Sequence, residues 1–189
     1  MKRAYAASQY AKPYEQYCRE LYPDQAEEIF RKAEEHYNEL VKNDMPDLGE
    51  NIMATNMLDW FTIVSFYEAS GHKLDGEALL TIKRRAVDRM KFLGKFVNGN
   101  KSKWPYKLFE KTYRNFIKMQ QEHQEKGEWM DSWKVEINPD HRTDHYLAEV
   151  MHARLIRTQT EALGGDCCDY WYVGDESPVL KEYQDLEQI

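Results

Sequence analysis

The first two-thirds of the chain repeats apolar residues every three to four positions, which places them on one face of an α-helix. This pattern predicts helices over 13–21, 24–42, 75–97 and 103–126. The segment 50–70 is apolar on more than one face, as is typical of a helix that is buried on all sides. We therefore expect a helical N-terminal part with 50–70 as its central helix.

Local signals mark the ends of these helices. Pro13 suits the first turn of a helix, where its missing N–H leaves no hydrogen bond unmade, and Pro23 ends that helix. Asp24 is predicted to cap the next helix by accepting hydrogen bonds from the free amides of its first turn. Gly71 follows the central helix as a stop signal, and Asp75 opens the helix after it.

The pattern changes after Gly127. Alternating apolar and polar residues predict strands over 132–138, 154–162 and 167–173, with a helix over 143–153 between the first two. A Gly-Gly-Asp turn at 164–166 suits a reversal between the last two strands. The fold class that follows is α+β, with a helix-rich N-terminal two-thirds packed with a small C-terminal antiparallel β-sheet.

Composition narrows the possibilities. The 189 residues include five Trp, thirteen Tyr and seven Phe, which is enough apolar area for one core, and we expect a single domain over 1–189. It would be mainly helical over about 13–126 and form a strand, a helix and a hairpin over about 132–175, with a polar, loosely held tail over 176–189. A net charge of −7 argues against a nucleic-acid partner, and no apolar run is long enough to span a membrane.

The three cysteines, Cys18, Cys167 and Cys168, are too few for a four-thiolate zinc site, and their odd number cannot close into a complete set of disulfides. The basic pair near the start has no apolar stretch behind it, so we expect no signal peptide. Reduced thiols and a cytoplasmic location are the simplest account.

Candidate chemistry concentrates in 141–172, and the adjacent thiols of Cys167 and Cys168 come first. Consecutive strand residues face opposite sides, so one thiol would point into the core and the other away from it. A thiolate is a strong nucleophile toward an amidine or carbonyl carbon. The alternative is that both are small apolar residues that pack in the sheet.

A second candidate is the helix face formed by His145, Glu149 and His152, which lie at i, i+4 and i+7. Two imidazoles and a carboxylate on one face could bind a metal or transfer protons. We favour the alternative to a metal site, a solvated polar face, because the helix is short and no fourth ligand is evident.

A third candidate is Arg157, because a guanidinium can hold a substrate carboxylate by two parallel hydrogen bonds. The alternative is a cross-strand salt bridge, for example with Asp169. The basic cluster 83–85 is interpreted as a solvated helix face. The aromatic residues of 60–67 are assigned to the core. The motifs GxGxxG, GxSxG and HExxH and the P-loop are absent from the sequence.

The stretch 144–175 resembles the L-2-amino-thiazoline-4-carboxylic acid hydrolase family. That family's pattern is an Asp, a helix with Glu and His, an Arg and a Thr, and a glycine turn into Cys-Asp and an aromatic strand. The sequence departs from it at His141, where a cysteine is expected. The matching residues are Asp144, Glu149, His152, Arg157, Thr160, Cys168 and Asp169.

The resemblance implies hydrolytic opening of a small cyclic amidine that carries a carboxylate, to give an N-carbamoyl amino acid. Cys168 would attack the amidine carbon while Asp144 or His152 transfers protons. Alternatively, Asp144 or Glu149 would activate a water molecule, and Cys168 would only shape the pocket.

The same resemblance places Arg157, Thr160 and Asp169 at the substrate, with Arg157 on the substrate carboxylate. We expect no cofactor and no metal. The expected partner is a small molecule bearing a carboxylate, with no nucleic acid and no membrane.

Three functions remain in order of preference. The first is a C–N hydrolase that acts on a cyclic amidine or related amide. The second is a non-catalytic protein that binds a small molecule or acts as an accessory on the same scaffold. The third is a helical interaction module with an exposed apolar groove. The enzyme requires that Asp144, His152, Arg157 and Cys168 surround one cavity.

Overall fold

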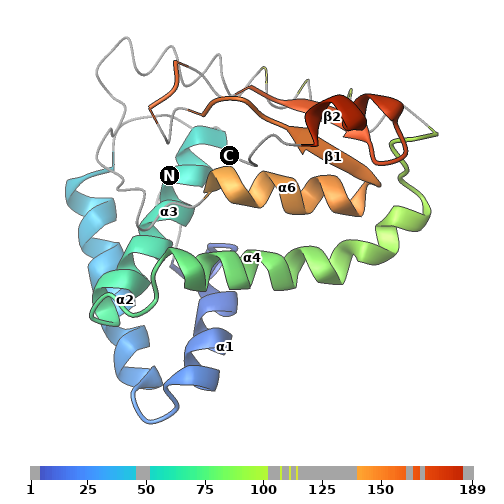
Figure 1. Cartoon of the computed structure of the whole chain (residues 1–189). Helices are drawn as coiled ribbons and strands as arrows, with labels where there is room; N and C mark the ends of the chain where they lie inside the picture. The colour runs from blue at the N-terminus through green and yellow to red at the C-terminus, as the bar shows by residue number, and fades with distance from the viewer. Residues whose placement is uncertain are drawn as a thin grey trace. The chain divides into compact units, whose positions relative to one another are not determined.

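A computed structural model shows a mainly helical chain with a two-stranded antiparallel sheet near its C-terminus, so the predicted α+β class is confirmed (Figure 1). The predicted strand 132–138 and nearly all of the predicted helix 103–126 lie outside the described residues. The structure describes residues 5–45, 52–101, 107, 111, 114, 140–160, 164–166 and 169–184.

The described residues divide between two compact units, and the division falls within a helix, between Ile82 and Lys83. Each unit has its own cluster of buried apolar side chains. The single domain over 1–189 stays a prediction.

The first unit contains the predicted N-terminal helices. A short 3₁₀ helix, η1 (Tyr5–Ala7), precedes α1 (Ala11–Leu21) and α2 (Ala26–Asn43). The central helix α3 (Ile52–Ala69) follows, and then α4 (Gly76–Met90), which continues into the second unit.

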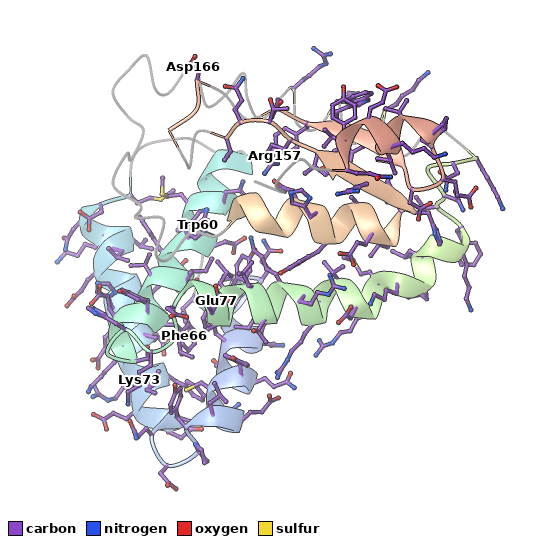
Figure 2. The ribbon with its side chains drawn as sticks, viewed as in Figure 1. Trp60, Phe66, Lys73, Glu77, Arg157 and Asp166 are labelled. Carbon is purple, nitrogen blue, oxygen red and sulfur yellow. The ribbon has the colours of Figure 1, made fainter. Side chains whose placement is uncertain are left out.

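The buried positions of α3 go all the way round the helix, as its sequence predicted. Phe61 and Phe66 are fully buried, and so are the polar residues Thr62 and Ser65 between them. Phe66 lies among the helices of this unit (Figure 2) and stacks on Tyr14 of α1 with 4.9 Å between ring centroids. Burial of aromatic area in this way stabilises the unit.

The connection from α3 to α4 uses the predicted signals. Gly71 has a φ of 64°, and its N–H bonds the carbonyl of Glu68 while the N–H of His72 bonds that of Tyr67. This is a Schellman ending, which requires a left-handed residue at this place. Asp75 Oδ1 then accepts the amides of the first turn of α4.

The predicted cap at Asp24 is wrong. Helix α2 begins at Ala26, so the capping position falls on Gln25, whose side chain makes no capping hydrogen bond. A carboxylate one residue further out is misplaced for the amides of the first turn. The first turn instead carries the negative charges of Glu27 and Glu28, which favour a helix N-terminus.

The second unit holds the rest of α4 and a 3₁₀ turn, η2 (Lys91–Lys95), followed by α6 (Asp140–Val150). Strand β1 (Ala153–Ile156) pairs antiparallel with β2 (Trp171–Gly174), from Ala153 opposite Gly174 to Ile156 opposite Trp171. A last 3₁₀ helix is η4 (Pro178–Tyr183).

Two predictions need correction in this unit. The strand predicted over 154–162 ends at Ile156, for a reason given below with Asp169. The tail is not loosely held over Pro178–Tyr183, because Pro178 starts a 3₁₀ turn and Tyr183 packs edge-on against Trp171 with ring centroids 5.4 Å apart. In the part of the chain that the structure describes, no helix is both long and apolar enough to cross a membrane.

Candidate functional site

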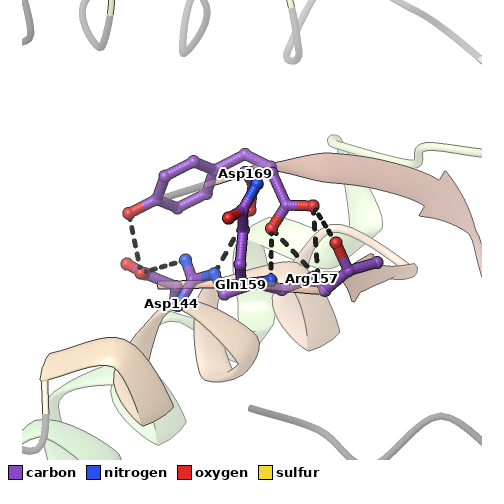
Figure 3. A network of polar contacts seen from close by, with 6 residues as sticks. Asp144, Arg157, Gln159 and Asp169 are labelled. Atoms are coloured by element: carbon purple, nitrogen blue, oxygen red, sulfur yellow. Dashed lines mark hydrogen bonds and ion pairs between the residues drawn. The ribbon is translucent and has the colours of Figure 1, made fainter. Parts of the chain in front are cut away.

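A buried ion pair forms the centre of the candidate site (Figure 3). Arg157, which directly follows β1, donates from Nη2 to Asp144 Oδ2 on α6 at 2.6 Å. The Tyr170 hydroxyl donates to the same oxygen at 3.2 Å. The Arg157 guanidinium also lies over the Tyr170 ring, 4.3 Å from its centroid. Two donors on one oxygen fix the orientation of the Asp144 carboxylate.

Burial differs between the two charged partners. The side chain of Arg157 has no solvent exposure, while that of Asp144 keeps 21%. The guanidinium is therefore bound by protein groups, and its Nε also donates to the backbone carbonyl of Asp169 at 3.3 Å. The carboxylate is the member of the pair that solvent, or a small molecule, can reach.

Asp169 organises the backbone next to this pair. Its carboxylate accepts the amides of Thr158 and Gln159, each at 3.0 Å, and the Thr158 hydroxyl at 2.8 Å. Because these two amides donate to a side chain, they do not donate to a neighbouring strand. This is why β1 ends at Ile156. Arg157 was predicted to form a salt bridge, for example with Asp169. It forms the salt bridge with Asp144, and Asp169 accepts a hydrogen bond from Arg157 only through its backbone carbonyl.

The environment of Asp169 keeps it charged. Burial acts to raise the pKa of this carboxyl group, but the hydrogen bonds from Gln159 and Thr158 outweigh it and lower the pKa below the ordinary value. The negative charge is therefore part of the folded structure at this turn.

Glu149 is held by a different cation. It is exposed and pairs with Arg84 of α4, whose Nη2 lies 2.9 Å from Glu149 Oε2. Arg84 also lies over the ring of Tyr146, 4.8 Å from its centroid. Both contacts join the second half of α4 to α6 within this unit.

His152 does not share a helix face with His145 and Glu149, so that prediction is wrong. Helix α6 ends at Val150, and His152 turns the chain toward β1 with a φ of 51°. Its Nδ1 lies 3.6 Å from Asp175 Oδ2. Strand β1 spans roughly 13 Å and lies between His152 and Arg157, so it separates His152 from the ion pair.

The described residues contain no group of three or more His, Cys, Asp or Glu side chains placed to hold a metal ion. Cys18 is buried in the first unit, and burial raises the pKa of its thiol. Cys167 and Cys168 lie outside the described residues. Thr160 is buried, and its carbonyl accepts the N–H of Gly165 in the turn at 3.0 Å.

Lys83 is the residue of this region that the sequence interpretation missed. It lies on α4 next to Arg84 and is only partly exposed. Burial lowers the pKa of its ammonium group to about 8, and the nearby negative charge of Asp144 opposes this shift. The basic cluster 83–85 is therefore not a uniformly solvated face: Lys83 and Arg84 are partly exposed, and only Arg85 is exposed.

The signal that could have found Lys83 is its position in the stripe of α4. Lys83 directly follows Ile82, which is buried in the first unit, and lies four residues before Val87, which is also buried. Position 83 thus borders the apolar face of the helix. Tyr170 was also missed, because no aromatic residue of its strand was singled out from the sequence.

Comparisons with known proteins add no relative. A scan against models of protein families, a search of curated proteins and a search of solved structures each found no match.

Proposed function

We propose that this chain is a hydrolase of the L-2-amino-thiazoline-4-carboxylic acid hydrolase type, which opens a small cyclic amidine bearing a carboxylate. The observation that carries the proposal is the contact between residues of the family-like pattern that are distant in sequence. Asp144 bonds Arg157, and Arg157 bonds the backbone of Asp169. A shared network is what a common site requires. Of the four residues that the enzyme was expected to gather, Asp144 and Arg157 are in contact, His152 pairs instead with Asp175, and Cys168 lies outside the described residues.

The reaction of a 2-amino-thiazoline consumes one water. Oxygen adds to the amidine carbon, the bond from that carbon to the ring sulfur breaks, and the sulfur leaves as a thiol. The amidine becomes a urea, so the product is an N-carbamoyl amino acid. Of the two protons of the water, one ends on the leaving sulfur and the other on an amidine nitrogen, which becomes an N–H of the urea. The protein must therefore accept protons from the attacking oxygen and return one to the sulfur.

Asp144 is the group that we assign to proton acceptance. Arg157 and Tyr170 hold its Oδ2, and the partial exposure of its side chain makes the carboxylate reachable. Arg157 acts here as a positioning residue, because its guanidinium is enclosed by protein. The attacking group is either a water molecule or the thiol of Cys168. In the second case the thiol forms a covalent isothiourea with the amidine carbon, and a water molecule then hydrolyses it to release the urea and the free thiol.

The alternative function is a non-catalytic protein that binds the same class of small molecule. The expected ligand in either case is a carboxylate-bearing small molecule, and the proposed location is the cytoplasm.

Turnover of 2-amino-thiazoline-4-carboxylate, followed by mass spectrometry, tests the proposal. We expect a product heavier by one water. The variant Cys168→Ser distinguishes the attacking groups: loss of turnover by at least 100-fold assigns attack to the thiol, and unchanged turnover assigns it to water. Cys18→Ser is the matched control. Wild-type protein that is folded and gives no product contradicts the hydrolase and leaves the binding protein.

A further inference from the structure

The 3₁₀ turn η2, the light-green turn after α4 in Figure 1, carries apolar side chains that are exposed to solvent. Phe92 and Leu93 within the turn are 59% and 37% exposed, and Phe96 directly after it is 78% exposed. In the part of the chain that the structure describes, they are three of the five large apolar residues that are exposed. Such a concentration within five consecutive residues is typical of a surface that contacts a partner.

The exposure of these side chains is set by the fold of the second unit. Gly94 is buried, and a Cβ at this position would lie 2.7 Å from the carbonyl oxygen of Val150, so the turn packs closely against the end of α6. Val97 packs against the apolar cluster of the unit, and its N–H bonds the Leu93 carbonyl at 2.9 Å. The turn is therefore anchored through Gly94 and Val97, and the two phenylalanines beside them stay outside.

The segment that carries these side chains is strongly basic, although the chain as a whole is acidic. Residues 83–101 contain seven Lys and Arg and a single acidic residue, Asp88, while the net charge of the chain is −7. Asp88 itself pairs with Lys91 at 2.7 Å and with Arg84 at 3.5 Å. Positive charge thus surrounds the exposed apolar side chains and attracts an anionic partner. The exposed basic residues of the segment are Arg85, Arg89, Lys91, Lys95 and Lys101.

We propose that these five basic residues, together with Phe92, Leu93 and Phe96, form a surface that binds anionic lipid membranes. We call it the η2 surface. The headgroup region of a bilayer takes in protruding phenylalanine side chains without a preformed pocket, whereas a protein partner would need a cavity for each ring. Lys and Arg beside them attract the anionic headgroups.

The proposal replaces the expectation of no membrane partner. That expectation followed from the lack of an apolar run long enough to span a bilayer, and contact at the membrane surface needs no such run. The η2 surface is also independent of the proposed hydrolase, because none of its residues takes part in the contacts between Asp144, Arg157 and Asp169.

Flotation of the full chain with lipid vesicles tests the proposal. One set of vesicles is phosphatidylcholine alone, and the other contains about 70% phosphatidylcholine and about 30% phosphatidylserine. We expect binding to the anionic vesicles and none to the neutral ones. The binding should weaken as salt is added, because salt screens the attraction between the basic side chains and the headgroups.

Variants at exposed positions separate the apolar and the charged contributions. The double variant Phe92→Ser/Phe96→Ser should bind the anionic vesicles about tenfold more weakly or worse. Its control is Leu21→Ser, which removes an exposed apolar side chain of the first unit. Lys95→Gln should weaken binding about fivefold, whereas Lys181→Gln, at an exposed position of the same unit, should leave it unchanged.

Each contrary outcome overturns the proposal. Folded wild-type protein that floats with neither set of vesicles contradicts membrane binding, and equal flotation with both contradicts the role of the basic residues. Binding that the double variant retains places the contact elsewhere. Analytical ultracentrifugation covers a further outcome: self-association that needs Phe92 and Phe96, without vesicle binding, would make the η2 surface a contact between copies of the chain. Circular dichroism of each variant shows whether a loss of binding reflects a loss of fold.

Discussion

Arg157 is the residue on which the contacts of the candidate site converge. Its guanidinium bonds a carboxylate and a backbone carbonyl, lies over an aromatic ring and has no exposure to solvent. A buried cation of this kind needs its anion, because an unpaired charge in the interior is strongly unfavourable. The pair therefore ties the end of β1 to α6, whatever reaction takes place beside it.

Asp169 yields a prediction about stability and pH. In Asp169→Asn we expect the free energy of unfolding at pH 7 to fall by about 1 kcal/mol, because the charged acceptor of the Thr158 and Gln159 amides is lost. The folded-state pKa of Asp169 is lowered, so the stabilisation is fully present above the unfolded value of 3.8. It is lost as the pH falls through the lower folded value.

Urea unfolding of wild type and variant at several pH values measures this difference. It should be present at neutral pH and vanish in acid. Asp166→Asn, which changes an exposed carboxylate of the neighbouring turn, serves as control. A difference that stays constant across the acid range would contradict the assigned role.

At the scale of elements, the periodicity of the sequence located the helices well. Helices α1 to α3 begin and end close to their predicted bounds, because an amphipathic stripe must face a core. Helix α4 begins as predicted but ends at Met90 and not at 97, and the 3₁₀ turn η2 follows it. Strand length was not predictable in the same way. Alternation continues beyond Ile156, but it does not reveal that the Asp169 side chain competes for the next amides.

The ending of α3 gives a prediction at this scale. Gly71 has a φ of 64°, and a Cβ there would meet no atom within 4 Å, so the cost of Gly71→Ala is one of backbone conformation alone. We expect the free energy of unfolding to fall by about 1 kcal/mol. Gly71→Asn should cost less, because asparagine tolerates the left-handed region. Equal stability of Gly71→Ala and wild type in urea unfolding would refute the Schellman ending.

At the scale of the whole molecule, the sequence predicted the fold class but only part of the site. Asp144 and Asp169 were both acceptable partners for Arg157 from residue type, and only the tertiary structure selects Asp144. Lys83 lies in a helix far along the chain from the family-like pattern, so no local spacing could connect it with Asp144. The net charge of −7 likewise says nothing about the two cations, Lys83 and Arg157, that gather near this carboxylate.

The most direct test of the hydrolase is kcat/KM for 2-amino-thiazoline-4-carboxylate in Asp144→Asn beside Glu149→Gln. Both variants remove one carboxylate charge from α6, but only Asp144 lies in the Arg157 network. We predict a loss of at least 100-fold for Asp144→Asn, in protein that remains folded, and a change within about threefold for Glu149→Gln. Equal activity of Asp144→Asn and wild type would contradict the assignment of Asp144 as the group that accepts the proton.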